Sequence, residues 1–322
     1  MPGEHVAAGA GRSNFAMERG TASWEQAGAA AAAPGGTAAW HRRRIAAYYD
    51  ATQVLYSTIW SRMRVHYGLW EPGTRRHREA VRNLDRWVAT RLALPAGGRV
   101  LDAGCGVGGT SLFLAEAHGL EITGITLSEV QLRRARRHAA HSRAVRVPTF
   151  QIGDYLRTGF ADASFDGIVA IESVCYAARK EEFLAEAHRL LRPGGRLVVS
   201  DGFRAGPVPL ALASRYRELL DGMALIDLAG VDDFDAALRR SGFVDVVCDD
   251  KHAAILPSAR RIAALSRLGI GVCHLPCHLG LFPRAWRDHG RAGLAQLPLF
   301  ASRALAYCVF SARKPLADAA RE

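Results

Sequence analysis

The central part of the chain alternates short apolar runs with amphipathic segments, a pattern that predicts alternating strands and helices. The apolar runs predict strands at residues 99–103, 121–126, 145–152, 165–172 and 196–201. The amphipathic segments predict helices at residues 109–118, 128–140 and 180–191. Because strands and helices alternate, we expect a mostly parallel sheet that helices cover on both faces.

The last third of the chain continues this pattern with longer connections. A helix is predicted at 233–240, and the last two strands are predicted at 244–249 and 304–311. Residues 204–231 and 251–303 also have helical patterning, so we expect helical cap insertions there rather than loose loops. The predicted fold class is α/β, a Rossmann-like doubly wound, mostly parallel seven-stranded sheet with helical cap insertions.

The first third divides into two segments. Residues 1–38 are rich in Ala and Gly with little apolar periodicity, so we expect a disordered tail. Residues 39–94 have a helical pattern with many aromatic side chains, which predicts an N-terminal helical cap segment. No run reaches about eighteen consecutive apolar residues, so a membrane span is not expected.

The chain is basic, with 42 Lys and Arg against 31 Asp and Glu, a formal net charge of +11. Only Lys180, Lys251 and Lys314 are lysines, and such an arginine skew often reflects coding bias. The charge is compatible with nucleic acid, an anionic membrane surface or a phosphorylated substrate. Basic and aromatic residues are not interleaved as in nucleic-acid modules, so we expect no nucleic-acid partner, whereas transient membrane-surface contact stays open.

Six cysteines lie far apart in a chain without a recognisable secretory signal, which predicts reduced thiols and a cytoplasmic location. Cys273 and Cys277 lie beside two histidines, but three residues separate the cysteines instead of two. Pro276, between them, is expected to break regular helical geometry. No metal site is therefore predicted.

A glycine-rich loop between the first strand and the first helix carries the strongest chemical signal. Gly104, Gly106 and Gly109 have the G-x-G-x-x-G spacing, which lets a nucleotide approach the backbone. A nicotinamide dinucleotide is the obvious alternative ligand. Asp102 would repel its pyrophosphate but attract a cationic amino group. Residues 124–128 also lack the acidic residue that the ribose of NAD usually meets, so a nucleoside with an amino-acid cation fits better.

Several short motifs accompany the glycine loop. They are Tyr48-Tyr49-Asp50, His66-Tyr67-Gly68, Gly124-Ile125-Thr126-Leu127-Ser128 with Gln131, Gly153-Asp154, Phe165-Asp166, Ile171-Glu172-Ser173 and Leu191-Arg192-Pro193-Gly194-Gly195. Together they resemble the class I S-adenosylmethionine-dependent methyltransferases, in particular the group with sterol, tocopherol and prenyl-diphosphate methyltransferases. The resemblance extends over residues 48–313 and implies a methyltransferase domain at 95–322 with S-adenosyl-L-methionine as cofactor.

The resemblance also implies cofactor-binding positions. The methionine part is expected to meet Asp102, Gly104, Cys105 and Gly106. The ribose is expected to meet Thr126, Leu127 and Gln131, and the adenine to meet Asp154 and Tyr155. From the residues alone, Asp102 could instead cap the following turn, and Gln131 could be a solvated helix residue.

Glu172 ends the predicted strand 165–172, at the carboxyl edge of the sheet where ligands of open α/β sheets bind. The resemblance places an acidic residue there in several acceptor pockets, so Glu172 is predicted to be catalytic, together with Tyr49 and His66. Tyr67, Tyr176 and Trp70 are further candidates for the pocket wall. Each aromatic could instead be core, and His66 could be a satisfied histidine at a helix end.

The predicted function is methylation of a small lipophilic acceptor, in the first place C-methylation of an isoprenoid such as a prenyl diphosphate, terpene or sterol in secondary metabolism. The alternatives are O- or N-methylation of an aromatic or polyketide natural product, and a non-catalytic cofactor-binding protein. Mg is expected only with a diphosphate acceptor. The basic runs at 42–44 and 75–78 could bind such a diphosphate, although a solvated helix face is the favoured explanation.

Overall fold

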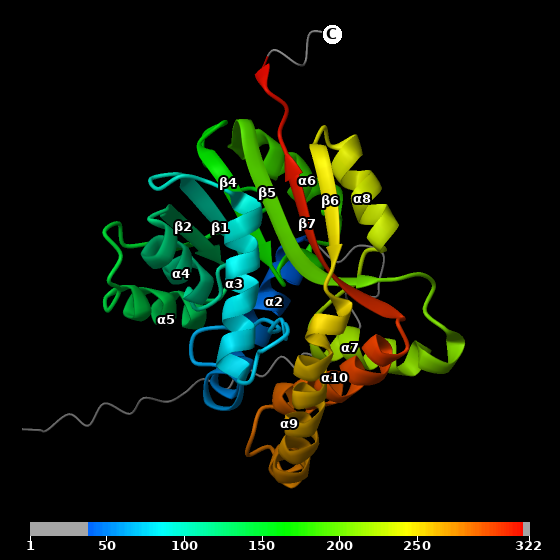
Figure 1. Cartoon of the computed structure of the whole chain (residues 1–322). Coiled ribbons are helices and arrows are strands. Elements are labelled where there is room, and N and C mark those ends of the chain that lie inside the picture. Colours follow the sequence, from blue (N-terminus) through cyan, green and yellow to red (C-terminus); the bar gives the residue numbers. More distant parts are fainter. Residues whose placement is uncertain (1–37, 318–322) are drawn as a thin grey trace, which may run out of the picture. The chain divides into compact units, whose positions relative to one another are not determined.

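The computed structural model describes residues 38–317, apart from the side chain of His274. The predicted disordered tail, residues 1–38, lies outside the described residues except for Ala38. Within the described part, seven strands form one sheet in the order β3-β2-β1-β4-β5-β7-β6 (Figure 1). Neighbouring strands are parallel except that β7 runs antiparallel to β5 and β6. The predicted α/β fold class is confirmed.

Most strands lie where the apolar runs predict them. Their bounds are β1 Arg99–Ala103, β2 Glu121–Thr126, β3 Thr149–Ile152, β4 Phe165–Ile171, β5 Leu191–Arg204, β6 Val244–Asp250 and β7 Leu305–Arg313. β3 is shorter than predicted because this edge strand pairs with β2 over four residues only, and Val145 is fully exposed. β5 is longer than predicted, since it begins at Leu191, with a register shift against β4, and extends along β7 to Arg204.

The alternation of side chains along the central strands separates two cores. On β5, Val198 packs into one core, whereas Leu197 and Val199 pack into the other. Helices α3 (His77–Leu92) and α4 (Gly109–His118) contribute to the first core, and α6 (Lys180–Leu190) and α8 (Val231–Arg240) to the second. Helix α5 (Glu129–Ala139) packs with α4 and β3 around Phe150. Layers on both faces leave the carboxyl edge of the parallel strands for a ligand.

Four helices gather beyond that carboxyl edge (Figure 1). They are α2 (Ala38–Leu55), α7 (Ala213–Gly222), α9 (His252–His278) and α10 (Arg284–Ala301). A π-helical turn, η1 (Tyr56–Trp60), follows α2, and two 3-10 turns, η2 (Val174–Tyr176) and η3 (Leu210–Leu212), complete the described helices. Because α10 packs against α9, α7 and α2, segments that are far apart in the sequence form one layer here. The boundaries drawn at 39–94, 95–322, 204–231 and 251–303 stay predictions.

Two sequence expectations differ from the structure. The helical prediction for residues 39–94 is wrong between Ser61 and Arg76, where the chain forms loops and bends. Pro276 does not interrupt α9, which continues to His278. A proline so close to the helix end removes one backbone hydrogen bond where few remain to be lost. Within the described residues no group of His, Cys, Asp and Glu could hold a metal ion, and no described helix could cross a membrane.

Candidate active site

The glycine loop connects β1 to α4 through residues with left-handed backbone geometry. Gly104 has φ +104°, and a Cβ there would fall 2.5 Å from the Cβ of Ser173, so only glycine fits. Gly106 has φ +53°. Gly109 starts α4, where a Cβ would lie 1.8 Å from the carbonyl oxygen of Met63. The loop at residues 61–66 therefore lies directly on the amino end of α4.

A cavity opens beside this loop at the carboxyl ends of β1, β2 and β4. Its lining includes six residues that the sequence assigned to the cofactor: Gly104, Gly106, Thr126, Leu127, Gln131 and Tyr155. The Thr126 hydroxyl donates to Oε1 of Gln131 at 3.0 Å, and Nε2 of Gln131 donates to Gln53 at 3.0 Å. This chain of neutral donors and acceptors holds Gln131 in place, so Gln131 is a buried residue and not a solvated one. We call this space the nucleoside cavity.

Asp102 lies in a small neighbouring cavity that it lines with Gly104, Cys105 and Gly106. Its side chain is buried, and among the described residues only the hydroxyl of Ser111 donates a hydrogen bond to it, at 2.5 Å. Burial raises the pKa of Asp102 to about 6. The carboxylate therefore keeps acceptor capacity for a cation that enters the cavity.

Asp154 is the predicted cofactor residue that lines none of the cavities described here. Its neighbours Gly153 and Tyr155 face the nucleoside cavity. The Asp154 carboxylate instead forms an ion pair with Arg42 at 3.1 Å and accepts the backbone N–H of Leu156 at 2.9 Å. These contacts fix the loop after β3, which places Tyr155 at the cavity.

Glu172 follows β4 and lies where three cavities meet. Its backbone has φ +48°, a left-handed conformation that is uncommon for a residue with a side chain. Oε1 accepts the backbone N–H of Tyr67 at 2.7 Å and the hydroxyl of Tyr307 at 2.8 Å. Burial raises the pKa of Glu172 to about 7, although nearby His66 and these two donors act in the opposite direction. A carboxylate with such a pKa can take up a proton near neutral pH.

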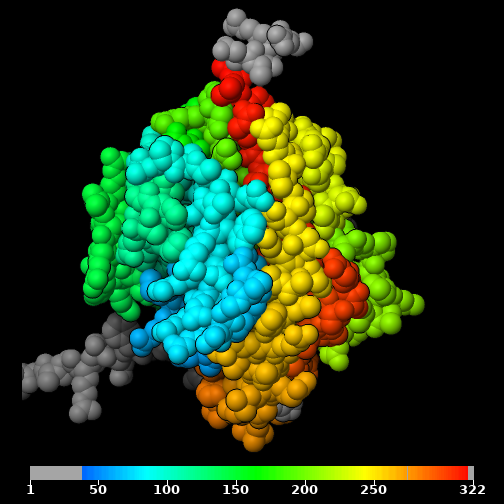
Figure 2. Space-filling model, in the orientation of Figure 1, coloured from blue at the N-terminus to red at the C-terminus, as the bar shows by residue number. Residues whose placement is uncertain are grey.

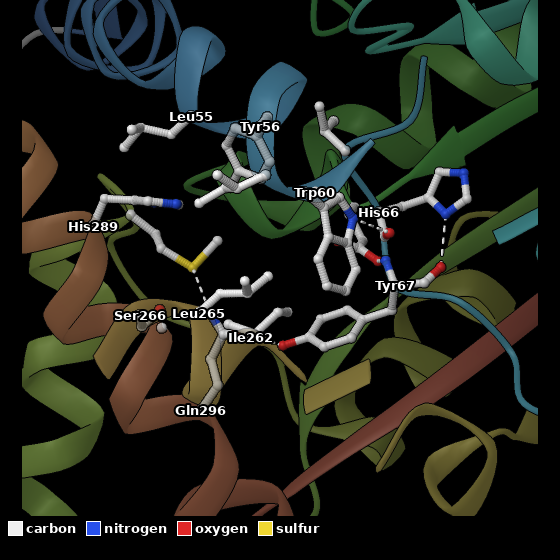
Figure 3. A pocket seen from close by; sticks show the side chains of 15 residues that line it. Leu55, Tyr56, Trp60, His66, Tyr67, Ile262, Leu265, Ser266, His289 and Gln296 are labelled. Carbon is white, nitrogen blue, oxygen red and sulfur yellow. Dashed lines mark hydrogen bonds between the residues drawn. The ribbon is translucent and has the colours of Figure 1, made fainter. Parts of the chain in front are cut away.

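His66, in the loop before α3, also lines one of these cavities, and its imidazole points away from the other labelled side chains (Figure 3). Nδ1 lies 2.7 Å from the carbonyl oxygen of Tyr67, and Nε2 lies 3.5 Å from the buried carboxylate of Asp85. Burial by itself would lower the pKa of His66, but Asp85, Glu172 and the Tyr67 carbonyl raise it above its usual value. His66 is therefore a buried histidine with polar partners in Tyr67 and Asp85, and it lies in a loop and not at a helix end.

Aromatic and apolar side chains form the walls of two further cavities around Glu172, which we call the acceptor cavities. The first is lined by Leu55, Tyr56, Ile59, Trp60, Val65, His66, Tyr67, Glu172, Met223, Ile262, Leu265, Ser266, His289, Gly293 and Gln296 (Figure 3). The second includes Tyr49, Tyr176, Phe300 and several leucines. Tyr49, Tyr67 and Tyr176 are thus brought together as expected, whereas Trp70 lines neither cavity and donates to Ser258.

Two kinds of site residue escaped the sequence analysis. Asp201 lines the second acceptor cavity, accepts the backbone N–H groups of Cys175 and Gly202 at 2.8 Å, and has a pKa raised by burial to about 6. Its position near the end of the predicted strand 196–201 was the same signal that pointed to Glu172. Val65 lines all of these cavities, but it comes from a loop that the sequence predicted as helix.

No Lys or Arg lines the acceptor cavities among the residues that the structure describes. Arg75, Arg76 and Arg78 are exposed, and Arg42 pairs with Asp154. The basic runs therefore lie outside the cavity walls. The acidic side chains of Glu172 and Asp201 line these cavities together with aromatic residues. The cavity walls therefore provide no positively charged side chain that could pair with a diphosphate.

Several known proteins are similar to this chain in sequence or in fold. Residues 101–199 match a family described as a methyltransferase domain. The 27-O-demethylrifamycin SV methyltransferase of Amycolatopsis mediterranei (strain S699) is 33% identical over 218 residues, which cover 67% of this chain and 79% of that protein. The 24-methylenesterol C-methyltransferase 2 of Oryza sativa subsp. japonica is 38% identical over 151 residues, covering 47% of this chain and 41% of that protein. A solved geranyl diphosphate methyltransferase has a TM-score of 0.69 at 17% identity and covers 85% of this chain and 99% of its own.

The doubly wound sheet and the glycine-lined cavity at its carboxyl edge define a nucleotide-binding protein of the α/β class. The rifamycin methyltransferase shares 33% identity with this chain over most of its own length. The chain therefore belongs to the S-adenosylmethionine-dependent methyltransferases and is an enzyme of that class. This membership confirms the resemblance drawn from the sequence motifs.

Proposed function

We propose that the enzyme methylates a hydroxyl oxygen of a neutral, lipophilic natural product, with Glu172 as the base. The observation that carries the proposal is the position of this carboxylate, at the junction of the nucleoside cavity and two largely apolar cavities. A base with a pKa of about 7 is suited to accept a hydroxyl proton at neutral pH. The 79% coverage of the rifamycin O-methyltransferase supports oxygen as the acceptor atom.

The neutral hydrogen-bonding groups of the nucleoside cavity and the buried carboxyl group of Asp102 beside it suit the chemistry of S-adenosylmethionine. We assign the methionine part to Asp102, Gly104, Cys105 and Gly106, where a buried carboxylate meets the ammonium group. Thr126, Leu127 and Gln131 then hold the ribose through neutral hydrogen bonds, and Tyr155, with Asp154 behind it, flanks the adenine. When bound, the cofactor supplies an electrophilic methyl group.

The chain's own residues position the acceptor and move its proton. Glu172 accepts the proton of the acceptor hydroxyl, which leaves the oxygen with an electron pair for bond formation. Tyr67 and Tyr307 fix the orientation of the carboxylate through their hydrogen bonds to Oε1. His66 acts to lower the pKa of Glu172, and Tyr49 lines both the nucleoside cavity and the second acceptor cavity. Aromatic walls exclude water and so favour a single orientation.

A second candidate is C-methylation of an isoprenoid alkene such as a terpene or sterol. One observation favours it: Tyr49, Tyr56, Tyr67 and Tyr176 surround Glu172 with π faces, which stabilise a developing carbocation. Glu172 would then remove a proton from carbon after methyl transfer. Within this candidate a prenyl diphosphate is disfavoured as acceptor because the described cavity walls carry no Lys or Arg. Mg was expected only with a diphosphate, so it is not part of the proposal. N-methylation of an amine is also compatible with two cavity carboxylates.

Product analysis tests the proposal. The enzyme is incubated with S-adenosylmethionine and a panel of polyketide phenols and alcohols, amines, terpenes, sterols and prenyl diphosphates, and products are located by mass spectrometry and NMR. We expect an O–CH3 product and a loss of about a hundredfold or more in kcat for Glu172→Gln. Glu116→Gln, an exposed charge loss remote from the cavities, is the control and should leave kcat unchanged. A C–CH3 or N–CH3 product would replace the first candidate with the corresponding alternative.

A further inference from the structure

The end of α9 presents an apolar surface that the proposed reaction does not use. Leu268, Val272, Leu275 and Leu279 are between 62% and 68% exposed. Spacings of four, three and four residues place Leu268, Val272 and Leu275 on one face of α9 and Leu279, the residue that caps the helix, in line with them. Leu281, in the turn that follows, is 72% exposed. These five residues are called the apolar stripe below.

The apolar stripe lies where an extended surface, such as a membrane, could reach it. The hairpin of α9 and α10 extends away from the sheet, and the stripe lies at the carboxyl-terminal end of α9, which is the end farthest from the sheet (Figures 1 and 2). Single exposed apolar side chains are common on protein surfaces, but a contiguous row of them indicates an interaction site.

The charged side chains near the apolar stripe indicate what kind of partner it would bind. Residues 252–301 contain six arginines and no lysine, and their one acidic residue, Asp288, is buried and paired with Arg287. Arg260 and Arg267 are exposed and seven residues apart, so they lie on one side of α9. Arg267 borders the start of the stripe, whereas Arg260 and exposed Arg261 lie about two helical turns before it. An apolar helix face bordered by arginines is typical of helices that lie on anionic membranes.

The same helix connects the stripe to the acceptor cavity. Ile262, Leu265 and Ser266, in the turns just before the stripe, line the first acceptor cavity. Ile59 lines it too and is 45% exposed, so the wall of the cavity reaches the surface there. A bilayer that touches α9 would therefore lie close to the opening of the cavity.

We propose that the apolar stripe and the nearby arginines dock the enzyme on an anionic phospholipid surface. The stripe inserts between acyl chains, the arginines contact the phosphate groups, and a lipophilic acceptor passes from the bilayer to the cavity with little exposure to water. The proposal does not depend on which acceptor atom is methylated.

Vesicle sedimentation of the full chain tests this docking. The probe is a vesicle of equal parts phosphatidylglycerol and phosphatidylcholine, compared with pure phosphatidylcholine. We expect binding to the anionic vesicles that is weakened about tenfold or more by the pair Leu275→Gln and Leu279→Gln, because less apolar surface inserts. The pair Arg260→Gln and Arg267→Gln should weaken it by a similar factor and make it less sensitive to salt.

Matched variants separate docking from general effects. Leu210→Gln with Leu316→Gln removes two exposed leucines elsewhere, and Arg133→Gln with Arg137→Gln removes two exposed positive charges from α5. Thermal unfolding confirms that each variant is folded. Equal binding by stripe and control variants would overturn the proposal, as would absent binding by the unaltered enzyme. So would ultracentrifugation in which the leucine changes convert a dimer to a monomer without any effect on vesicle binding.

Discussion

Three carboxyl groups near the carboxyl ends of parallel strands have a raised pKa. Asp102 on β1 and Asp201 on β5 are buried and Glu172 after β4 is half-buried, and loss of solvation raises the pKa of Asp102, Asp201 and Glu172 to about 6, 6 and 7. Perturbed carboxyls in a cleft mark functional positions because burial of charge is costly unless a ligand compensates for it. We therefore expect ligands, and not neighbouring side chains, to complete their environment.

Asp102 is predicted to make cofactor affinity depend on pH. Its ionised form attracts the ammonium group of the cofactor, so affinity for S-adenosylhomocysteine should fall as pH is lowered through about 6. Asp102→Asn should bind about tenfold or more weakly at pH 8 and lose this pH dependence. Titration calorimetry between pH 5 and pH 8 measures both effects, with Glu186→Gln on α6 as a control. A parallel pH dependence in Asp102→Asn would contradict the assignment.

Glu172 is predicted to lower stability at high pH. Its folded-state pKa, about 7, lies above the unfolded value of 4.5, so the stability from burial of the neutral acid is full below pH 4.5 and is lost as pH rises through 7. Glu172→Gln stays neutral and keeps an oxygen for Tyr67 and Tyr307. The variant should be similar to the unaltered enzyme at pH 5 and more stable by about 2 kcal/mol at pH 8. Chemical denaturation at pH 5 and pH 8 measures the free energy of unfolding of the variant and of the unaltered enzyme. An equal difference between the two proteins at both pH values would argue against a raised pKa of Glu172 in the folded state.

At the scale of elements, the loop at residues 61–67 depends on one buried carboxylate from α3. Asp85 accepts hydrogen bonds from Nε of Arg64 at 2.6 Å and from Thr110 on α4 at 2.8 Å, and it faces His66. These contacts lower the pKa of Asp85 despite its burial. Because Val65 lies between Arg64 and His66, Asp85 determines where the loop closes over the cavities.

Replacing Asp85 should loosen this loop. Asp85→Asn leaves Arg64 without its counter-charge, so we expect about 3 kcal/mol lower stability, faster hydrogen exchange at residues 61–67 and several-fold weaker cofactor binding. The control is Arg91→Gln, which breaks an ion pair between the other end of α3 and Asp249 on β6. It should lower stability without changing exchange in the loop. If cofactor affinity stayed the same in Asp85→Asn, the loop would be only a packing element.

At the scale of the whole molecule, the acceptor cavities are assembled from both ends of the chain. Leu55 and Tyr56 come from α2 and η1, Glu172 from the sheet, and Ile262 and Gln296 from α9 and α10. Helices around a cavity that must admit and then enclose a substrate are expected to be less rigid without it.

We therefore predict that ligands slow hydrogen exchange in the four helices beyond the sheet. S-adenosylhomocysteine together with an acceptor should protect α2, α7, α9 and α10, whereas S-adenosylhomocysteine alone should mainly protect residues 104–108 and 126–131. Helices α6 and α8, on a sheet face away from the cavities, serve as the internal reference. Unchanged exchange in the four helices would show that they are rigid walls.

The sequence by itself determined the doubly wound sheet, because short apolar runs and helical periodicity are local properties of the chain. It also indicated the glycine loop, Asp102 and Glu172, since they lie at the carboxyl ends of predicted strands, where parallel sheets bind ligands. Gln131 was indicated only by the resemblance to known methyltransferases. The same argument would have found Asp201. Their roles in binding and catalysis stay predictions, as does the cytoplasmic location.

The tertiary structure alone decided what surrounds Glu172. Residues 61–76 lack helical geometry because Asp85 and α4 hold the loop by contacts distant in sequence, which no local pattern records. The partners of Glu172, Tyr67 and Tyr307, lie 105 and 135 residues away from it. Packing of α10 on α2 and α9 likewise depends on the folded sheet. The raised pKa of Glu172 is therefore a property of the fold, because burial by distant segments produces it.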